Sequence, residues 1–204
     1  MRTTGRAALC ALLTVSACTI APLPEGAGPG AGPAVVPPAG YGTLRQEDVS
    51  LTLTSGDLRL MVTPLHPSVT RVTAPDTERR LAGLAATHVP TTAGDGTGVF
   101  LVSFYSDQPD VAFEPEEVQF ISRGLRIRPR EILPITPSWG EQRVAQRETE
   151  MAVYSFGDGL DLESTLVLAY QFEQSTQWNT ILPRVQAERA RVRARAGVAP
   201  TPGV

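Results

Sequence analysis

Among its 204 residues the sequence has no lysine, only two cysteines and two histidines, and 6% aromatic residues. Two cysteines cannot build a disulfide framework, so the fold must be held by its hydrophobic core. Two histidines without a His-Glu-x-x-His pattern do not indicate the usual zinc site with three protein ligands. We therefore expect no disulfide-stapled domain, no metal site and no other cofactor.

Long apolar runs and an excess of positive charge are also missing. No apolar stretch approaches the ~20 residues that a membrane-spanning helix needs. The 18 basic residues, all of them arginine, are outnumbered by 21 acidic residues. This balance argues against nucleic acid as a partner, because proteins that bind nucleic acid usually present a basic face.

The first 17 residues have the layout of an export signal. Arg2 and Arg6 form a positive start, residues 7–14 form a short apolar segment, and small residues precede Cys18. The segment carries two arginines and no acidic residue, so the formal charge changes from −3 for the whole chain to −5 without it. The leader predicts that the chain is exported.

The end of this leader, Val15-Ser16-Ala17-Cys18, resembles the lipobox of bacterial lipoproteins. The resemblance implies transfer of diacylglyceryl to the Cys18 sulfur, cleavage after Ala17 and acylation of the new amino terminus. Three acyl chains anchor a protein firmly, since each buried methylene contributes ~0.8 kcal/mol. An ordinary secretory signal with a cysteine beside its cleavage site is the alternative.

The residue after Cys18 bears on which membrane holds the anchor. The residue at this position is Thr19 and not aspartate, which resembles the pattern of lipoproteins that two-membrane bacteria forward to the outer membrane. The expected location is therefore the outer membrane, facing the periplasm. In an organism with one membrane it is the outer face of the plasma membrane.

Composition divides the rest of the chain into a linker, a domain, a helix and a tail. Residues 18–44 are rich in proline and glycine and poor in large apolar residues, which predicts a linker that begins with the lipidated cysteine. Residues 45–175 are expected to form a single domain, because about 130 residues suffice for one core. A helix over 176–196 and a disordered tail over 197–204 complete the expected organisation.

Alternation of apolar and polar residues from Val49 onward predicts β-strands. Strands over 49–54 and 58–62, separated by Ser55-Gly56, form an expected hairpin. Residues 99–105 are apolar on both faces and predict a central strand. Further strands are expected over 118–120, 125–128, 151–156 and 166–172, the last two as a second hairpin, with Leu125, Ile127 and Phe172 facing inward.

This pattern predicts a mainly β fold, an antiparallel β-sandwich with one short inserted helix and a C-terminal helix. Roughly seven strands about ten residues apart favour a sandwich, with a small closed barrel as the alternative. The pattern resembles an immunoglobulin-type sandwich at the level of architecture only, because the Cys…Trp…Cys spacing of antibody domains is absent.

Two helices interrupt or follow the predicted strands. Thr73 is expected to cap the inserted helix, with Pro75 in its first turn. One face of this helix is expected to carry Leu81, Leu84, Ala85 and His88. The C-terminal helix is expected from Ile181 to Ala196, with Pro183 in its first turn.

The two histidines are the first candidates for chemistry. His66 lies between prolines and His88 near the end of the inserted helix. With loop carboxylates they could serve a hydrolase or a metal site, but only if one pocket holds both. Surface or half-buried histidines without such a role are the alternative.

Acidic residues and glycines in turns are the next candidates. Asp107 with Asp110, and Asp158 with Asp161 and Glu163, lack the calcium-loop spacing and are expected to support their turns. The glycines at 94, 96 and 98 precede a strand, so they do not indicate a phosphate loop, which must open a helix. Glu116-Glu117 could be half of a glycosidase pair, although a solvated strand entrance is favoured.

The last helix and the two tryptophans supply the candidate binding surface. The arginines of this helix surround it, because alternate residues of a helix are ~200° apart. They could contact anionic headgroups or an acidic partner, or simply complement the helix C-terminus. The tryptophans would anchor an interface if exposed and belong to the core if buried. The candidate surface comprises Trp139, Trp178, Arg189, Arg191, Arg193 and Arg195.

The sequence therefore predicts an envelope lipoprotein anchored through Cys18, with a non-enzymatic domain that binds another envelope protein or stabilises an assembly. No catalytic residue is assigned. One alternative is an envelope hydrolase or metal-binding protein that uses His66, His88 and loop carboxylates. Another is a domain that binds lipid or cell-wall polymer through the arginine-rich helix.

Overall fold

The computed structural model describes residues 36–88 and 90–198. The predicted signal peptide, Cys18 and the linker up to residue 35 lie outside the described residues, as does the predicted tail from residue 199. All of the described residues belong to the second of two units of the chain, Pro33–Val204. The fold below is that of the second unit.

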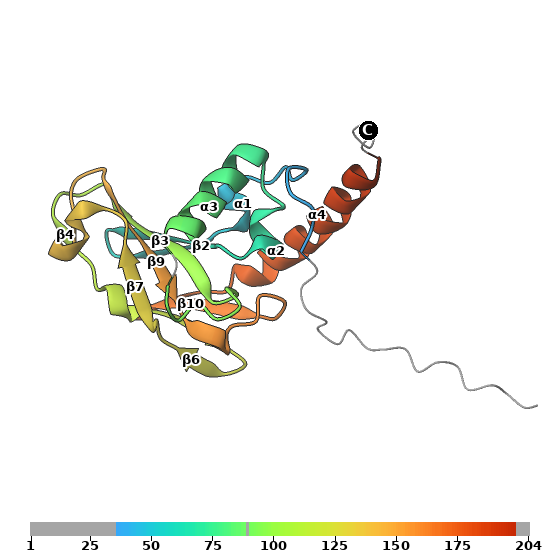
Figure 1. Cartoon of the computed structure of the whole chain (residues 1–204). Coiled ribbons are helices and arrows are strands. Elements are labelled where there is room, and N and C mark those ends of the chain that lie inside the picture. The colour runs from blue at the N-terminus through green and yellow to red at the C-terminus, as the bar shows by residue number, and fades with distance from the viewer. Residues whose placement is uncertain (1–35, 89, 199–204) are drawn as a thin grey trace, which may run out of the picture. The chain divides into compact units, whose positions relative to one another are not determined.

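Most described strands belong to two antiparallel sheets (Figure 1). The five-stranded sheet has the order β1-β2-β3-β9-β7, with strands Leu51–Ser55, Leu58–Pro64, Val99–Ser106, Thr149–Ser155 and Glu131–Pro134. The four-stranded sheet has the order β11-β10-β5-β6, with strands Glu173–Ser175, Leu166–Tyr170, Val118–Ser122 and Leu125–Ile127. A separate pair joins β4 (Val111–Ala112) to β8 (Arg143–Val144). The predicted mainly β, antiparallel fold with a C-terminal helix is confirmed.

The first predicted hairpin and the central strand are confirmed. Leu51 pairs with Val62 and Ser55 with Leu58, around Gly56 at a φ of 56°. β3 lies between β2 and β9 and is buried on both faces. A strand covered on both faces needs apolar residues at successive positions, which is the pattern of residues 99–105.

The second predicted hairpin is wrong. β9 pairs with β3 and β7, whereas β10 pairs with β5 and β11, so the chain crosses between sheets through the 3₁₀ turn η3 (Gly157–Gly159). β10 turns into β11 instead. Gln171 has a left-handed φ of 52°, and Phe172 in the same turn is 100% exposed. The turn ends the alternation that would have placed Phe172 inward.

The sequence pattern also predicted the burial of Leu125 incorrectly. It is 70% exposed at the turn end of β6, while Ile127 two residues later packs partly against the core. β6 has three residues and a partner on one side only. Alternation therefore predicted the right face of this edge strand, but not how far the core extends along it.

The two sheets share one hydrophobic core. Phe100 on β3 and Phe120 on β5 pack with tilted rings whose centroids are 4.6 Å apart, and Phe156 contacts both rings edge-on. These contacts join strands of opposite sheets. Both sheets therefore contribute apolar side chains to the same core.

Three helices and two 3₁₀ turns precede the last strands: α1 (Gln46–Val49), α2 (Pro67–Thr70), α3 (Pro75–Thr87), η1 (Pro115–Glu117) and η2 (Pro137–Glu141). α3 covers the outer face of the five-stranded sheet, where Leu81 packs with Leu65, Val99, Leu101 and Val153. Its predicted apolar face is confirmed. The predicted threonine cap is wrong, because the Thr73 hydroxyl donates to the Thr70 carbonyl and Ala74 occupies the cap position.

α4 (Trp178–Val198) begins three residues before the predicted start at Ile181, so Pro183 lies inside the helix and not in its first turn, and it ends two residues after the predicted end at Ala196. Its buried residues include Trp178, Ile181, Val185 and Val192, a stripe that packs on the core. The helix is therefore packed on the body along most of its length (Figure 1).

The described end of the predicted linker is folded against the body. The backbone amides of Thr43 and Leu44 both donate to the Val72 carbonyl at 3.1 Å, and Ala74 donates to Leu44 at 2.8 Å. At Gly42 a Cβ atom would lie 2.3 Å from the Val72 and Thr73 backbones, so only glycine permits this approach. The folded body thus begins before the predicted boundary at residue 45.

Candidate functional site

A buried carboxylate on α4 joins the N-terminal segment of the body to its last helix. The Glu188 side chain is 1% exposed and lies on the same stripe as Val185 and Val192. It accepts hydrogen bonds from the Thr43 hydroxyl at 2.8 Å, from Arg195 at 2.7 Å and from Arg191 at 3.3 Å. Burial raises the pKa of Glu188, but these hydrogen bonds outweigh it and hold the pKa below its ordinary value.

Further bonds hold the segment 37–44, which we call the entry segment. Arg195 donates to the Tyr41 carbonyl at 2.7 Å, and the Gly40 amide donates to Glu78 on α3 at 2.9 Å. Arg71, at the end of α2, donates to the Pro37 carbonyl at 3.3 Å. The entry segment therefore lies against residues of α3 and α4 and the end of α2.

Arg189 is internal and not part of a surface, contrary to the sequence-based expectation. It is 5% exposed, donates to the Ser68 carbonyl at 2.9 Å and pairs with Glu163 at 2.5 Å. Its Nη2 atom is buried without a partner among the described residues. The guanidinium links α4 to α2 and to the loop before β10, so its role in the described body is structural.

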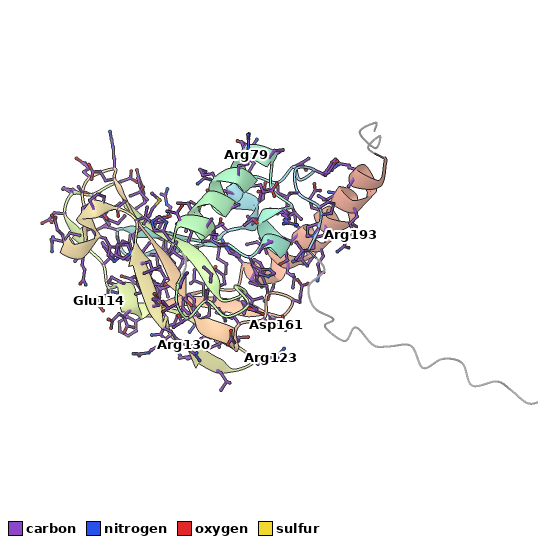
Figure 2. The ribbon with its side chains drawn as sticks, viewed as in Figure 1. Arg79, Glu114, Arg123, Arg130, Asp161 and Arg193 are labelled. Atoms are coloured by element: carbon purple, nitrogen blue, oxygen red, sulfur yellow. The ribbon has the colours of Figure 1, made fainter. Side chains whose placement is uncertain are left out.

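Both tryptophans are also buried. Trp178 is 0% exposed and donates its indole N–H to the Leu162 carbonyl at 3.2 Å. Trp139 is 5% exposed and packs against Phe104 and Phe113. Of the six residues of the candidate surface, only Arg191, Arg193 and Arg195 are exposed on α4, where Figure 2 labels Arg193.

The histidines do not share a pocket. A hollow of about 420 Å³ lies between α2, α3 and residues 90–96, and His66 lines it while His88 does not. His88 is the C-terminal cap residue of α3, and its buried Nδ1 has no hydrogen-bond partner among the described residues. The geometric condition for a two-histidine site is therefore not met.

His66 has a defined tautomer in this hollow. The Ser68 amide donates to its Nδ1 at 3.2 Å, so Nδ1 is an acceptor and Nε2 carries the proton in the neutral ring. Burial lowers the pKa of His66, although the charge of Asp95 acts in the opposite direction. A neutral imidazole therefore forms part of the wall at neutral pH.

Most residues in the wall of the hollow are apolar and have short side chains. Residues from three segments contribute, with His66, Thr70, Arg71 and Glu78 as its polar groups. The remaining lining residues are Leu65, Pro67, Ala82, Ala85, Ala86, Pro90, Ala93, Gly96 and Val99. Sequence reasoning singled out His66 as a candidate for chemistry, whereas it considered Gly96 only for a phosphate loop that it rejected and Ala85 only as part of a helix face. The missed signal is the series Ala82, Ala85 and Ala86, which leaves one helix face without a bulky side chain.

The acidic turns are occupied by local bonds. Asp161 pairs with Arg123 at 2.7 Å, side by side in Figure 2, and accepts from the Glu163 amide at 2.9 Å. Asp107 accepts from the Tyr105 hydroxyl at 2.6 Å, and Asp110 pairs with Arg143. Among residues 36–88 and 90–198, no group of three metal-ligating side chains is assembled.

A second hollow, of about 450 Å³, lies beside η1. Glu114, Glu116 and Glu117 surround it, and Trp139, Ile132 and Gln142 complete its wall. The Tyr154 hydroxyl donates to the Pro115 carbonyl at 3.0 Å and holds this turn against the core. Glu114 and Glu116 are exposed and Glu117 is half-buried, which fits the solvated entrance expected for Glu116-Glu117.

Comparison with protein-family models, with curated proteins and with solved structures gives no match for this chain. Among the helices that the structure describes, none is both long and apolar enough to cross a bilayer.

Proposed function

We propose that this chain is a lipid-anchored lipoprotein of the cell envelope, attached through Cys18, whose β-rich body binds another envelope protein or stabilises an assembly. The observation that carries the proposal is Val15-Ser16-Ala17-Cys18 at the end of an export-type leader. Thr19 after the cysteine supports the outer membrane, facing the periplasm, in a two-membrane organism. In an organism with one membrane, the outer face of the plasma membrane is proposed.

The entry segment supports a role as an anchored body. Because residues 37–44 are bonded to α2, α3 and α4, an upstream lipid would hold the body from that side. We also propose that the body is an immunoglobulin-like sandwich at the level of architecture. Two antiparallel sheets that share one core support this proposal.

Binding to a protein is preferred over binding to lipid or cell-wall polymer through α4. Arg191 and Arg195 both pair with Glu188, so part of the positive charge on this helix is already neutralised. Protein binding is also preferred over hydrolysis or metal binding by the two histidines, because His66 lines the α2–α3 hollow and His88 does not.

Metabolic labelling with an alkyne analogue of palmitate tests the anchor. We expect the wild-type chain to be labelled and to sediment with membranes, and Cys18→Ala to lose both properties. Cys10→Ala is the matched control and should keep both, because Cys10 lies inside the apolar leader. A bare amino terminus after Ala17 in the mature protein, measured by mass spectrometry, would contradict the proposal.

The binding role is tested by covalent crosslinking in intact cells. We expect one defined complex of higher mass that forms with the wild-type chain and is lost with Cys18→Ala, because the unanchored body leaves its partner's membrane. Hydrolase activity of the purified protein, without any such complex, would overturn this part of the proposal.

A further inference from the structure

The hollow between α2 and α3 is an unfilled apolar space beside a well-packed core. The hollow is open to solvent on one side, and Ala82 and Ala86 of its wall are exposed. This hollow has about 420 Å³, within the range of roughly 300–1,000 Å³ that small-ligand sites occupy. It is too small to receive a helix or a strand of another protein.

The chemistry of the wall selects an apolar ligand. Ala82, Ala85 and Ala86 on α3 line the space together with Pro67 of α2 and the residues Pro90 and Ala93. These side chains have few or no rotamers to lose, so ordering them around a ligand costs little entropy. Water in such a space would find few polar partners, whereas an alkyl chain would replace it without loss of hydrogen bonds.

The polar groups at the hollow connect it to the entry segment. Arg71 and Glu78 line the hollow and also bond to Pro37 and Gly40, respectively. The hollow therefore lies next to the point where the chain from Cys18 enters the body. If Cys18 is lipidated as proposed above, the body is tethered to a membrane, and acyl chains are the most abundant apolar molecules there.

We infer that the α2–α3 hollow binds a single fatty acyl chain, with the carboxylate end at the mouth beside Arg71. This ligand class rests on the proposed lipid anchoring, while the hollow and its apolar wall do not. A single chain fits a hollow at the small end of the range for ligand sites, whereas a two-chain phospholipid does not.

Photo-crosslinking tests the inference on the full-length lipidated protein in phospholipid vesicles. The probe is a twelve-carbon fatty acid with a diazirine at its methyl end, and the crosslinked residues are mapped by mass spectrometry of peptides. We expect crosslinks within 82–86 and 90–99. Ala82→Phe, which places a ring in the hollow from an exposed position, should weaken them at least ~5-fold by occupying the space.

Gly83→Phe is the matched control. It adds the same ring one residue away, where an added Cβ has no neighbour within 4 Å, and should leave the crosslinks unchanged. Ala86→Leu is a second filling variant in case the ring at position 82 disturbs the helix, and should also weaken them. Equal labelling of both filling variants and the control, or crosslinks only outside the hollow, would overturn the inference.

Two further arms separate the possible failures. A diazirine phosphatidylcholine that labels the hollow more strongly than the fatty acid would overturn the single-chain assignment. Loss of hollow labelling with intact palmitate labelling of Cys18 would refute this inference alone. Crosslinks in the hollow of a protein whose Cys18 is never lipidated would refute the anchor and leave the acyl site standing.

Discussion

Glu188 is a buried carboxylate that connects the start of the body to its last helix. Its carboxylate is bonded to Thr43, which lies 145 residues earlier, and to two arginines of its own helix. Removing one partner from such a buried network leaves the others without their counter-charge. The side chain therefore couples the entry segment to α4.

Glu188→Gln is expected to lower the free energy of unfolding by about 1–3 kcal/mol near neutral pH, because the amide cannot balance Arg191 and Arg195. The folded pKa of Glu188 lies below its ordinary value of 4.5, so its ionised form stabilises the fold above about pH 4.5. That contribution is lost as the pH falls through the folded pKa. The difference between wild type and variant should therefore shrink below pH 4.5 in urea titrations.

The control for this measurement is Glu173→Gln, at an exposed position on β11. It should change the free energy of unfolding by less than about 0.5 kcal/mol, as exposed substitutions usually do. A difference between wild type and Glu188→Gln that stays constant from pH 7 to pH 3 would contradict the stated role of the ionised carboxylate.

At the scale of elements, α3 carries a glycine that its helix does not need. Gly83 is exposed, and a Cβ there would meet nothing within 4 Å. Glycine costs about 1 kcal/mol relative to alanine in a helix interior, because more backbone freedom is lost on folding. Gly83→Ala should therefore raise the free energy of unfolding by about 0.5–1 kcal/mol and Tm by about 1–4 °C.

Gly42→Ala is the matched comparison and should have the opposite sign. Its Cβ would lie 2.3 Å from the backbones of Val72 and Thr73, so the entry segment would have to move away. Calorimetry of the two variants checks both expectations. A Gly42→Ala variant as stable as wild type would show that the entry segment is not held against residues 72–73 in solution.

For the molecule as a whole, the shared core predicts cooperative unfolding of the body. Leu60 on β2 and Leu168 on β10 are both 0% exposed and belong to one cluster across the two sheets. Leu60→Ala and Leu168→Ala should each cost about 2–5 kcal/mol and move the same transition. Tryptophan fluorescence and far-UV circular dichroism should report coincident curves in urea.

A different result would contradict the single core. If Leu168→Ala produced a separate early transition that left the Leu60 sheet folded, the two sheets would be independent units. The slope of the free energy of unfolding against urea concentration, measured for both variants, distinguishes this case. This slope scales with the surface that each transition exposes.

Local patterns determined several features of this protein from the sequence alone. The β1–β2 hairpin, the two-sided burial of β3 and the apolar face of α3 all follow from side-chain periodicity over a few residues. The leader ending at Cys18 is also a local pattern, because its features are contiguous in the chain. It stays a prediction, since that segment lies outside the described residues.

The tertiary structure alone decided which of these elements meet. It placed β9 and β10 in different sheets, buried Trp178 and Arg189 of α4, and laid the entry segment against Val72. It also left the α2–α3 hollow open. Such features depend on contacts between residues far apart in the chain, and periodicity within one element carries no information about its neighbour.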